Sequence, residues 1–293
     1  MSMATKYLAT AAALLTFASG CGGAEQEQAG GPQQQTIVDD PGPIHVHGLG
    51  VNPRDGALFI ATHSGVFRAE EGEGKASRVA GRYQDTMAFK ITGPDRFLAS
   101  GHPDGREGLP PFLGLISSSD AAGTWQPISL QGKTDFHLLE ASGQRVYGFG
   151  SDFDSRNEQL LVSSDAGRSW DRRVAPEPLI GMAIDPTDPD TAIVSGARGL
   201  HASENAGRSW QRRGGRPGLL SWPRHDRLFS IDREGTVRVS RDAGGNWVEA
   251  GALRGEPAAF RAETDTDLYA ALHDGTVLKS SDGGKIWSVR STP

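Results

Sequence analysis

Histidines and carboxylates gather in the first half of the chain, and their types fit metal chemistry. Five of the eight histidines lie between positions 45 and 137. His45 and His47 form a His-x-His pair, which on a strand presents two imidazoles on one face. Imidazole combined with carboxylate suits a divalent ion such as Zn or Cu. The predicted metal ligands are His45, His47, Asp85, His102 and His137. The alternative is that these side chains line a wet polar channel.

The same region contains groups that could act on a carbohydrate. Hydrolysis of a glycosidic bond generally requires two carboxyl groups flanking that bond. Asp85 and Asp135 are the predicted acid/base pair, and Arg106 could hold an acidic sugar. The predicted ligand-binding residues are His47, His63, Arg106, Glu107 and Asp152.

A short repeat indicates which elements position these residues. Four segments read Ser-x-Asp/Asn-x-Gly-x-x-Trp, namely 163–170, 203–210, 240–247 and 280–287, and segment 118–125 has its Gly displaced by one place. The five tryptophans are 45, 40, 37 and 40 residues apart. A period near 40 residues is typical of a propeller blade. Asp or Asn accepts backbone N–H bonds in a tight turn, and Gly supplies the positive φ.

This pattern resembles the Asp-box, or BNR repeat, of the sialidase-like superfamily of β-propellers. The segments HVHGLGVNP, QDTMAF, SGHPDGREGLPP and DFH give a closer resemblance to predicted bacterial glycosylhydrolase-like Asp-box lipoproteins. The resemblance implies an all-β fold, with each Asp-box joining the third and fourth strands of a blade, away from the active site. The sialidase Arg-Ile-Pro segment is absent and no three-arginine clamp can be assigned, so true sialidase activity is not expected.

Counting repeats predicts one propeller of about six four-stranded blades over residues 44–293, in which the C-terminus supplies its own last strand. A twelve-residue offset between the first two strands of a blade aligns His47, Asp85 and Asp135, with Ile180 in blade 4. That position lies where the innermost strand begins. The second strands return to the same end at His63, His102 and Asp152. We therefore expect one functional mouth on blades 1–3.

The N-terminus is predicted to direct export and to anchor the protein. Residues 1–20 have a positive start and a 12-residue apolar run, which is typical of a signal peptide. The only cysteine, Cys21, follows Ala-Ser-Gly in a lipobox-like segment and is the predicted lipidation site. Residues 21–43 would then be a flexible tether rich in Gly, Gln, Glu and Pro. The predicted location is extracytoplasmic, on a membrane.

Composition narrows the function without deciding it. The chain has 293 residues, a net charge of −6, 39 Gly and 17 Pro. An acidic chain is not expected to bind nucleic acid, and a single Cys excludes an internal disulfide framework. A monomer is expected. Three functions stay open: a glycosyl hydrolase-like protein that binds or cleaves a carbohydrate-type ligand, a divalent-metal-binding propeller, and a non-catalytic protein-binding or assembly module.

Overall fold

The structure, a computed structural model, describes residues 42–293. The predicted signal peptide, Cys21 and almost all of the predicted tether lie outside these residues. Among residues 42–293, no helix has the length and apolar character of a membrane span. The single helical element there is a 3-10 turn, η1, at Val79–Gly81.

Twenty-four strands form six antiparallel sheets, each of four strands taken in chain order. Blade 1 contains β1 (Val46–Val51), β2 (Leu58–Thr62), β3 (Gly65–Ala69) and β4 (Ser77–Arg78). Blade 2 contains β5 (Asp85–Gly93), β6 (Arg96–His102), β7 (Leu115–Ser118) and β8 (Gln126–Ser129). Blade 3 contains β9 (Thr134–Ser142), β10 (Arg145–Asp152), β11 (Glu158–Ser163) and β12 (Asp171–Arg173).

The other three blades repeat this order. Blade 4 contains β13 (Leu179–Ile184), β14 (Ala192–Gly196), β15 (Gly199–Ser203) and β16 (Gln211–Arg213). Blade 5 contains β17 (Leu219–Arg224), β18 (Arg227–Ile231), β19 (Thr236–Ser240) and β20 (Val248–Ala252). Blade 6 contains β21 (Pro257–Ala262), β22 (Leu268–Leu272), β23 (Val277–Ser280) and β24 (Ser288–Ser291). The predicted all-β propeller with six four-stranded blades is confirmed.

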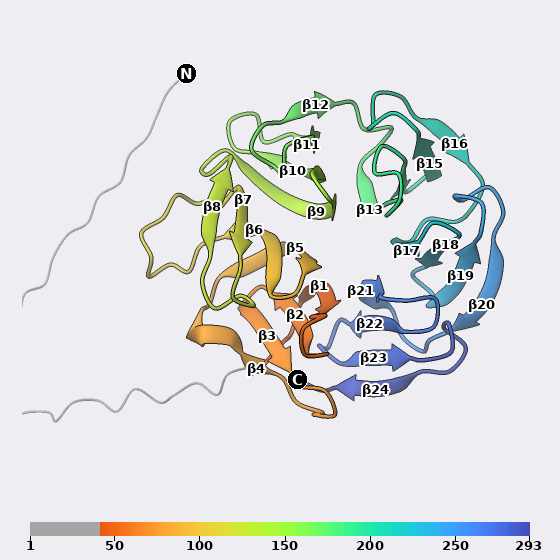
Figure 1. Cartoon of the computed structure of the whole chain (residues 1–293), viewed down its shortest axis with the longest axis horizontal. Coiled ribbons are helices and arrows are strands. Elements are labelled where there is room, and N and C mark those ends of the chain that lie inside the picture. The colour runs from red at the N-terminus through yellow and green to blue at the C-terminus, as the bar shows by residue number, and fades with distance from the viewer. Residues whose placement is uncertain (1–41) are drawn as a thin grey trace, which may run out of the picture. The chain divides into compact units, whose positions relative to one another are not determined.

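The six sheets stand around a common axis with their first strands innermost (Figure 1). Each innermost strand contacts the innermost strand of the next blade, and β21 contacts β1, which closes the ring. Apolar side chains fill the space between neighbouring blades. Phe59 of blade 1 packs edge-on against Phe97 of blade 2, with ring centroids 4.8 Å apart. Burial between sheets contributes roughly 25 cal/mol per Å² of apolar surface.

The five repeated segments form the turns between the third and fourth strands of blades 2–6. In blade 3, Ser163 Oγ donates to Asp165 Oδ1 at 2.7 Å and accepts the N–H of Gly167 at 2.8 Å. Asp165 Oδ1 also accepts the N–H of Ser169 at 2.9 Å. The other four turns repeat these three bonds. The repeated polar residues are therefore used for turn structure.

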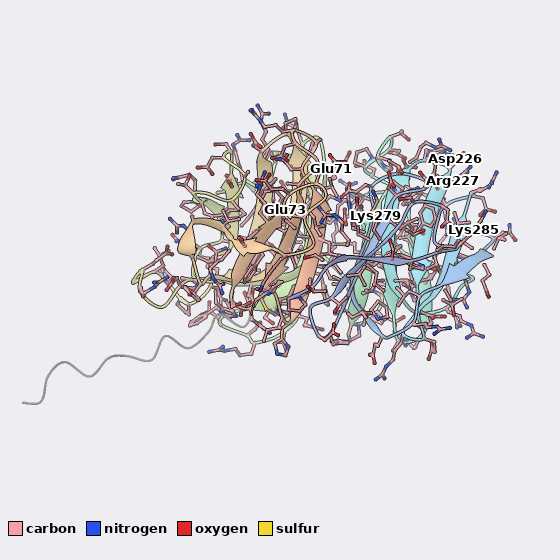
Figure 2. All side chains as sticks on the ribbon, turned by 90° about the horizontal axis from the view of Figure 1, so that it is seen from below. Glu71, Glu73, Asp226, Arg227, Lys279 and Lys285 are labelled. Carbon is pink, nitrogen blue, oxygen red and sulfur yellow. The ribbon has the colours of Figure 1, made fainter. Side chains whose placement is uncertain are left out.

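Blade 1 lacks this turn. Its third and fourth strands are joined by the acidic segment 70–76, whose Glu71 and Glu73 are labelled in Figure 2. This segment meets the end of the chain, because Lys75 pairs with Thr292 in a parallel bridge. Arg290 also donates to the carbonyl of Glu70 at 2.7 Å. As expected, the C-terminus supplies its own fourth strand, β24, and these contacts join blade 6 to blade 1.

Candidate functional site

The predicted site residues lie at the face opposite the repeated turns. Strand pairing places the start of each first strand beside the end of the second strand: Val46 pairs with Thr62, Asp85 with His102, and Asp135 with Ser151. The turn after each second strand lies at the same face. We call the polar side chains at this face of blades 1–3 the mouth.

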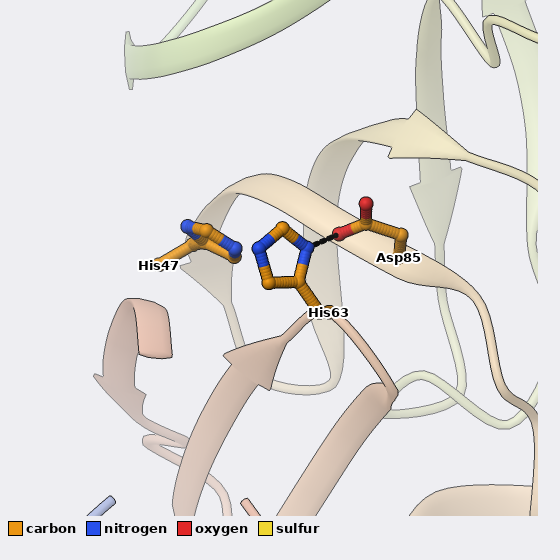
Figure 3. A group of neighbouring side chains, drawn as sticks. All are labelled: His47, His63 and Asp85. Atoms are coloured by element: carbon orange, nitrogen blue, oxygen red, sulfur yellow. Dashed lines mark hydrogen bonds and ion pairs between the residues drawn. The ribbon is translucent and has the colours of Figure 1, made fainter. Parts of the chain in front are cut away.

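Three side chains of the mouth converge (Figure 3). One ligand atom from each of His47, His63 and Asp85 lies within 4.8 Å of the others. His63 Nδ1 and Asp85 Oδ1 are 2.9 Å apart, and the second ring nitrogen of His63 faces His47. The two imidazole rings meet edge-on, with centroids 4.3 Å apart. We call these three residues the triad.

His47 is the most constrained member of the triad. Its Nε2 atom is buried and has no hydrogen-bond partner among residues 42–293. Burial, reinforced by the neighbouring imidazoles of His63 and His137, lowers the pKa of His47 to about 4. The ring is therefore neutral at pH 7, which is the form that can donate a lone pair to a metal.

The pKa of Asp85 is shifted from that of a surface aspartate. Its burial raises the pKa of the carboxyl group, and the contact with His63 opposes that rise. A carboxylate with little solvation gains most from a nearby cation, whether a protonated imidazole or a metal ion.

Asp135 organises a second group. Its side chain is 4% exposed, and its Oδ2 lies 3.1 Å from His137 Nε2 and 3.3 Å from His102 Nε2. Burial opposes ionisation, but the hydrogen bonds from the two imidazoles hold the pKa of Asp135 below its ordinary value. The same bonds raise the pKa of His137, and that of His102 to about 9. Asp135 Oδ1 is buried without a partner in the described part of the chain.

The five predicted metal ligands thus do not form one cluster. His47 and Asp85 belong to the triad, whereas His102 and His137 contact Asp135. His45 is exposed, with φ of 54°, and its ring lies 5.6 Å from that of His63. The reason is the carboxylate of Asp135, which engages two of the predicted ligands itself.

The alignment of the innermost strands also needs correction. Five of them bulge near their start, at His47, Met87, His137, Ile180 and Ala258. When the blades are aligned on these bulges, His47 corresponds to Met87 and His137. Asp85 and Asp135 lie two residues earlier and correspond to His45. Counting back twelve residues failed because the first hairpin differs in length, with six residues between β1 and β2 but two between β5 and β6.

The loop residues predicted to bind a ligand are engaged locally. Arg106 Nε donates to Asp104 at 2.9 Å, and Glu107 pairs with Arg82. Asp152 accepts the backbone N–H of Ser155 at 2.8 Å and so caps its own turn. The structure does not bring Arg106, Glu107 or Asp152 into contact with the triad, and their roles stay predictions.

The sequence prediction missed the roles of two residues. His63 was predicted as a ligand-binding residue and not as a metal ligand, although pairing of the first hairpin puts it beside His45 and His47. Met87 was not singled out, because a bulge that turns a methionine toward the axis leaves no mark in the hydrophobic pattern.

The fold and the mouth together define a six-bladed β-propeller with a polar site at one end of its axis. No family model matches the chain, and no curated protein matches it in sequence. Among solved structures, it is similar to a gluconolactonase from Xanthomonas campestris, with 15% identity, a TM-score of 0.62, and coverage of 85% of this chain and 87% of that one.

Two further solved structures share the propeller fold. A structure described as an ancestral GH74 enzyme has 13% identity and a TM-score of 0.54, with 85% of this chain and 38% of that chain covered. YCF48 bound to D1 peptide has 16% identity and a TM-score of 0.51, with 85% and 82% covered. The chain spans less than half the length of the first two GH74 structures it matches. At these identities the likeness establishes the fold alone.

Proposed function

We propose that this protein is a metal-binding β-propeller whose triad holds one divalent ion, Zn²⁺ or Cu²⁺, at the mouth. The observation that carries the proposal is the convergence of His47, His63 and Asp85 within 4.8 Å. Bonds of about 2.0–2.1 Å place two ligand atoms of one ion roughly 3.3 Å apart. Metal binding would therefore draw the three ligand atoms closer together than they are in the structure.

Three protein ligands leave a coordination position open, as in catalytic metal sites. A hydroxyl or carboxylate oxygen of a carbohydrate-type ligand could fill that position. The gluconolactonase and GH74 structures share only the fold with this chain, and that shared fold is the support they give to a carbohydrate-type ligand. The ion would polarise a bound oxygen, and the buried Asp135 would lie nearby as a fixed negative charge.

Elemental analysis tests this proposal directly. The chain, purified without chelator and then dialysed against Zn²⁺, is expected to contain one equivalent of metal. Asp85→Asn should reduce that content, because the amide keeps the shape but loses the charge. An absence of metal in the unaltered protein, with no uptake of added Zn²⁺ or Cu²⁺, would reject the proposal.

A second candidate function is metal-independent glycoside hydrolysis. The observation that favours it is the opposite direction of two pKa shifts: burial raises the pKa of Asp85, while hydrogen bonds from His102 and His137 lower that of Asp135. Such a pair supplies an acid and a base. Here a glycan-substrate screen should find an activity that survives chelator and is lost in Asp85→Asn and Asp135→Asn. Hydrolysis unchanged in both variants would exclude this role.

The Asp-box assignment, lipid anchoring and extracytoplasmic location belong to the same proposal. The repeated turns support the first, and the lipobox-like segment before Cys21 supports the other two. The chain expressed in a bacterial host should partition into detergent, whereas Cys21→Ser should remain in the aqueous phase. Equal partitioning of both would argue against lipidation.

A protein-binding role is the remaining alternative. Tyr83 and Leu109 are 48% and 43% exposed, next to and within the 103–111 loop. A partner recovered from membranes should be lost when Leu109 is changed to Ser. A partner that is retained by this variant would bind elsewhere.

A further inference from the structure

A cavity of about 240 Å³ lies on the propeller axis. Its lining includes His47, Met87, His137, Ile180 and Ala258, the bulge residues of five innermost strands. A β-bulge adds one residue to a strand and re-aims its side chain. The five bulges therefore present one ring of side chains to the cavity.

The ring is chemically uneven. Blades 1, 2 and 3 contribute His47, Met87 and His137, each of which can bind a metal. Blades 4 and 6 contribute Ile180 and Ala258, which cannot. Thioether sulfur is a soft ligand that selects Cu(I), and imidazole binds copper as well. We propose that His47, Met87 and His137 bind one cuprous ion inside the channel.

The two histidines are prepared for this role. The Nε2 atom of His47 is buried and lacks a partner among the described residues, so a ligand at that atom would satisfy it. His137 Nε2 contacts Asp135, which leaves Nδ1 as the nitrogen without a hydrogen-bond partner among residues 42–293. A carboxylate on the far nitrogen of a metal-bound histidine is the usual supporting arrangement.

The ligand set suits a cuprous ion. Two imidazoles and one thioether carry no charge when they bind a metal, and the thioether favours Cu(I) over a divalent ion such as Zn²⁺. The rest of the cavity lining is mixed, since it includes Leu49 and Phe260 as well as the charged residues Lys90, Glu140 and Arg261.

The opposite end of the channel is closed by charged side chains. Lys90, Glu140 and Arg261 line both this cavity and the pocket on the other face, so they separate the two. Lys90 and Glu140 form an ion pair. An ion would therefore enter from the mouth, past the triad.

The cuprous site does not depend on the proposed divalent site. The two sites share His47 but differ in their other ligands, since the triad needs His63 and Asp85 while the channel needs Met87 and His137. Each site can fail alone, and the variants separate them.

The test is an anaerobic competition for Cu(I) against bicinchoninate. All chains carry Cys21→Ser, because a thiolate would also bind Cu(I). We expect one Cu(I) per chain, an affinity reduced at least tenfold in Met87→Leu, and no more than a twofold change in His63→Ala. Zn²⁺ binding should show the reverse dependence. The matched control is Met182→Leu, which removes the other cavity-lining methionine away from the bulges.

Two results would overturn the proposal: no Cu(I) taken from the chelator, or equal affinity in the Met87→Leu and Met182→Leu variants. X-ray absorption at the copper edge of the otherwise unaltered protein decides the matter if Met87→Leu fails to fold. One sulfur neighbour is expected, and a spectrum without sulfur rejects the site.

Discussion

At the residue scale, the mouth places its histidines in opposite electrostatic environments. His47 is buried among other imidazoles, whereas His102 is hydrogen-bonded to a carboxylate. The pKa of the first falls to about 4 and that of the second rises to about 9. At pH 7 one ring is therefore neutral and free to bind a metal, while the other is a fixed positive charge.

These shifts predict opposite pH dependences of stability. A lowered pKa means that the unfolded chain binds the proton more readily, so the contribution of His47 is present above pH 6.5 and is lost as the pH falls toward 4. With chelator present, that loss should be on the order of 2–3 kcal/mol. His47→Gln should abolish this part of the acid limb in urea unfolding measured between pH 4 and 7.

His102 predicts the reverse. Its raised pKa stabilises the fold fully below pH 6.5, and that stabilisation is lost as the pH rises through 9. His102→Gln should flatten the alkaline limb and leave the acid limb in place. NMR titration of the two ring protons checks both predictions, and midpoints near 6.5 for both residues would contradict this electrostatic account.

At the element scale, the repeated turn combines a hydrogen-bonded serine with a residue in the left-handed region, which is glycine in blades 3–6 and Ala122, with φ of 67°, in blade 2. Gly167 has φ of +83°, and a Cβ there would lie 2.1 Å from Leu115 Cδ2. Gly72, in the blade 1 segment without a repeat, has φ of +84° but no atom within 4 Å of such a Cβ.

This contrast gives a matched pair of variants. Gly167→Ala should cost about 2–4 kcal/mol, because it adds overpacking to the left-handed penalty. Gly72→Ala should cost only about 1 kcal/mol, from the left-handed backbone alone. Free energies of unfolding from denaturant titration distinguish the two effects, and equal losses would mean that packing under the turn has relaxed.

The strands and turns also show which features of the fold could be predicted from the sequence. The repeat predicted six sheets, their order and the face that carries the mouth, because serine, aspartate, glycine and tryptophan each have a fixed task in the turn. The sequence did not predict which residues of different blades lie at the same position along the propeller axis. The first hairpins differ in length, and the bulges at His47, Met87 and His137 depend on backbone geometry that no residue type encodes.

At the scale of the whole molecule, the ring depends on the contact between its last and first blades. Arg290 of β24 donates to backbone carbonyls of the 70–76 segment, and the backbone N–H of Thr292 donates to the carbonyl of Gly74 at 2.9 Å. On the inner side, Glu263 Oε1 accepts the N–H of Val51 at 2.9 Å. Blades 1 and 6 are therefore joined both at their outer strands and at their inner strands.

Arg290→Ala should weaken this closure. Loss of these charge-assisted bonds to backbone carbonyls should lower the free energy of unfolding by about 1–3 kcal/mol. Faster amide exchange in β4 and β24 than in the other outer strands should accompany it. Arg241→Ala, at an exposed arginine of the blade 5 turn, is the control and should change little. A uniform change in exchange across all six outer strands would argue against a specific closure.

The central claim is that the mouth on blades 1–3 is a metal site and not a polar lining. Calorimetric titration of the metal-free chain with Zn²⁺ tests it, with His63→Ala compared against His273→Ala. His273 follows β22 as His63 follows β2, but it belongs to blade 6, where no triad forms among the described residues. We predict one Zn²⁺ per chain for the unaltered protein and for His273→Ala, with at least a tenfold weaker affinity for His63→Ala. No binding, or equal binding by the two variants, would contradict the claim.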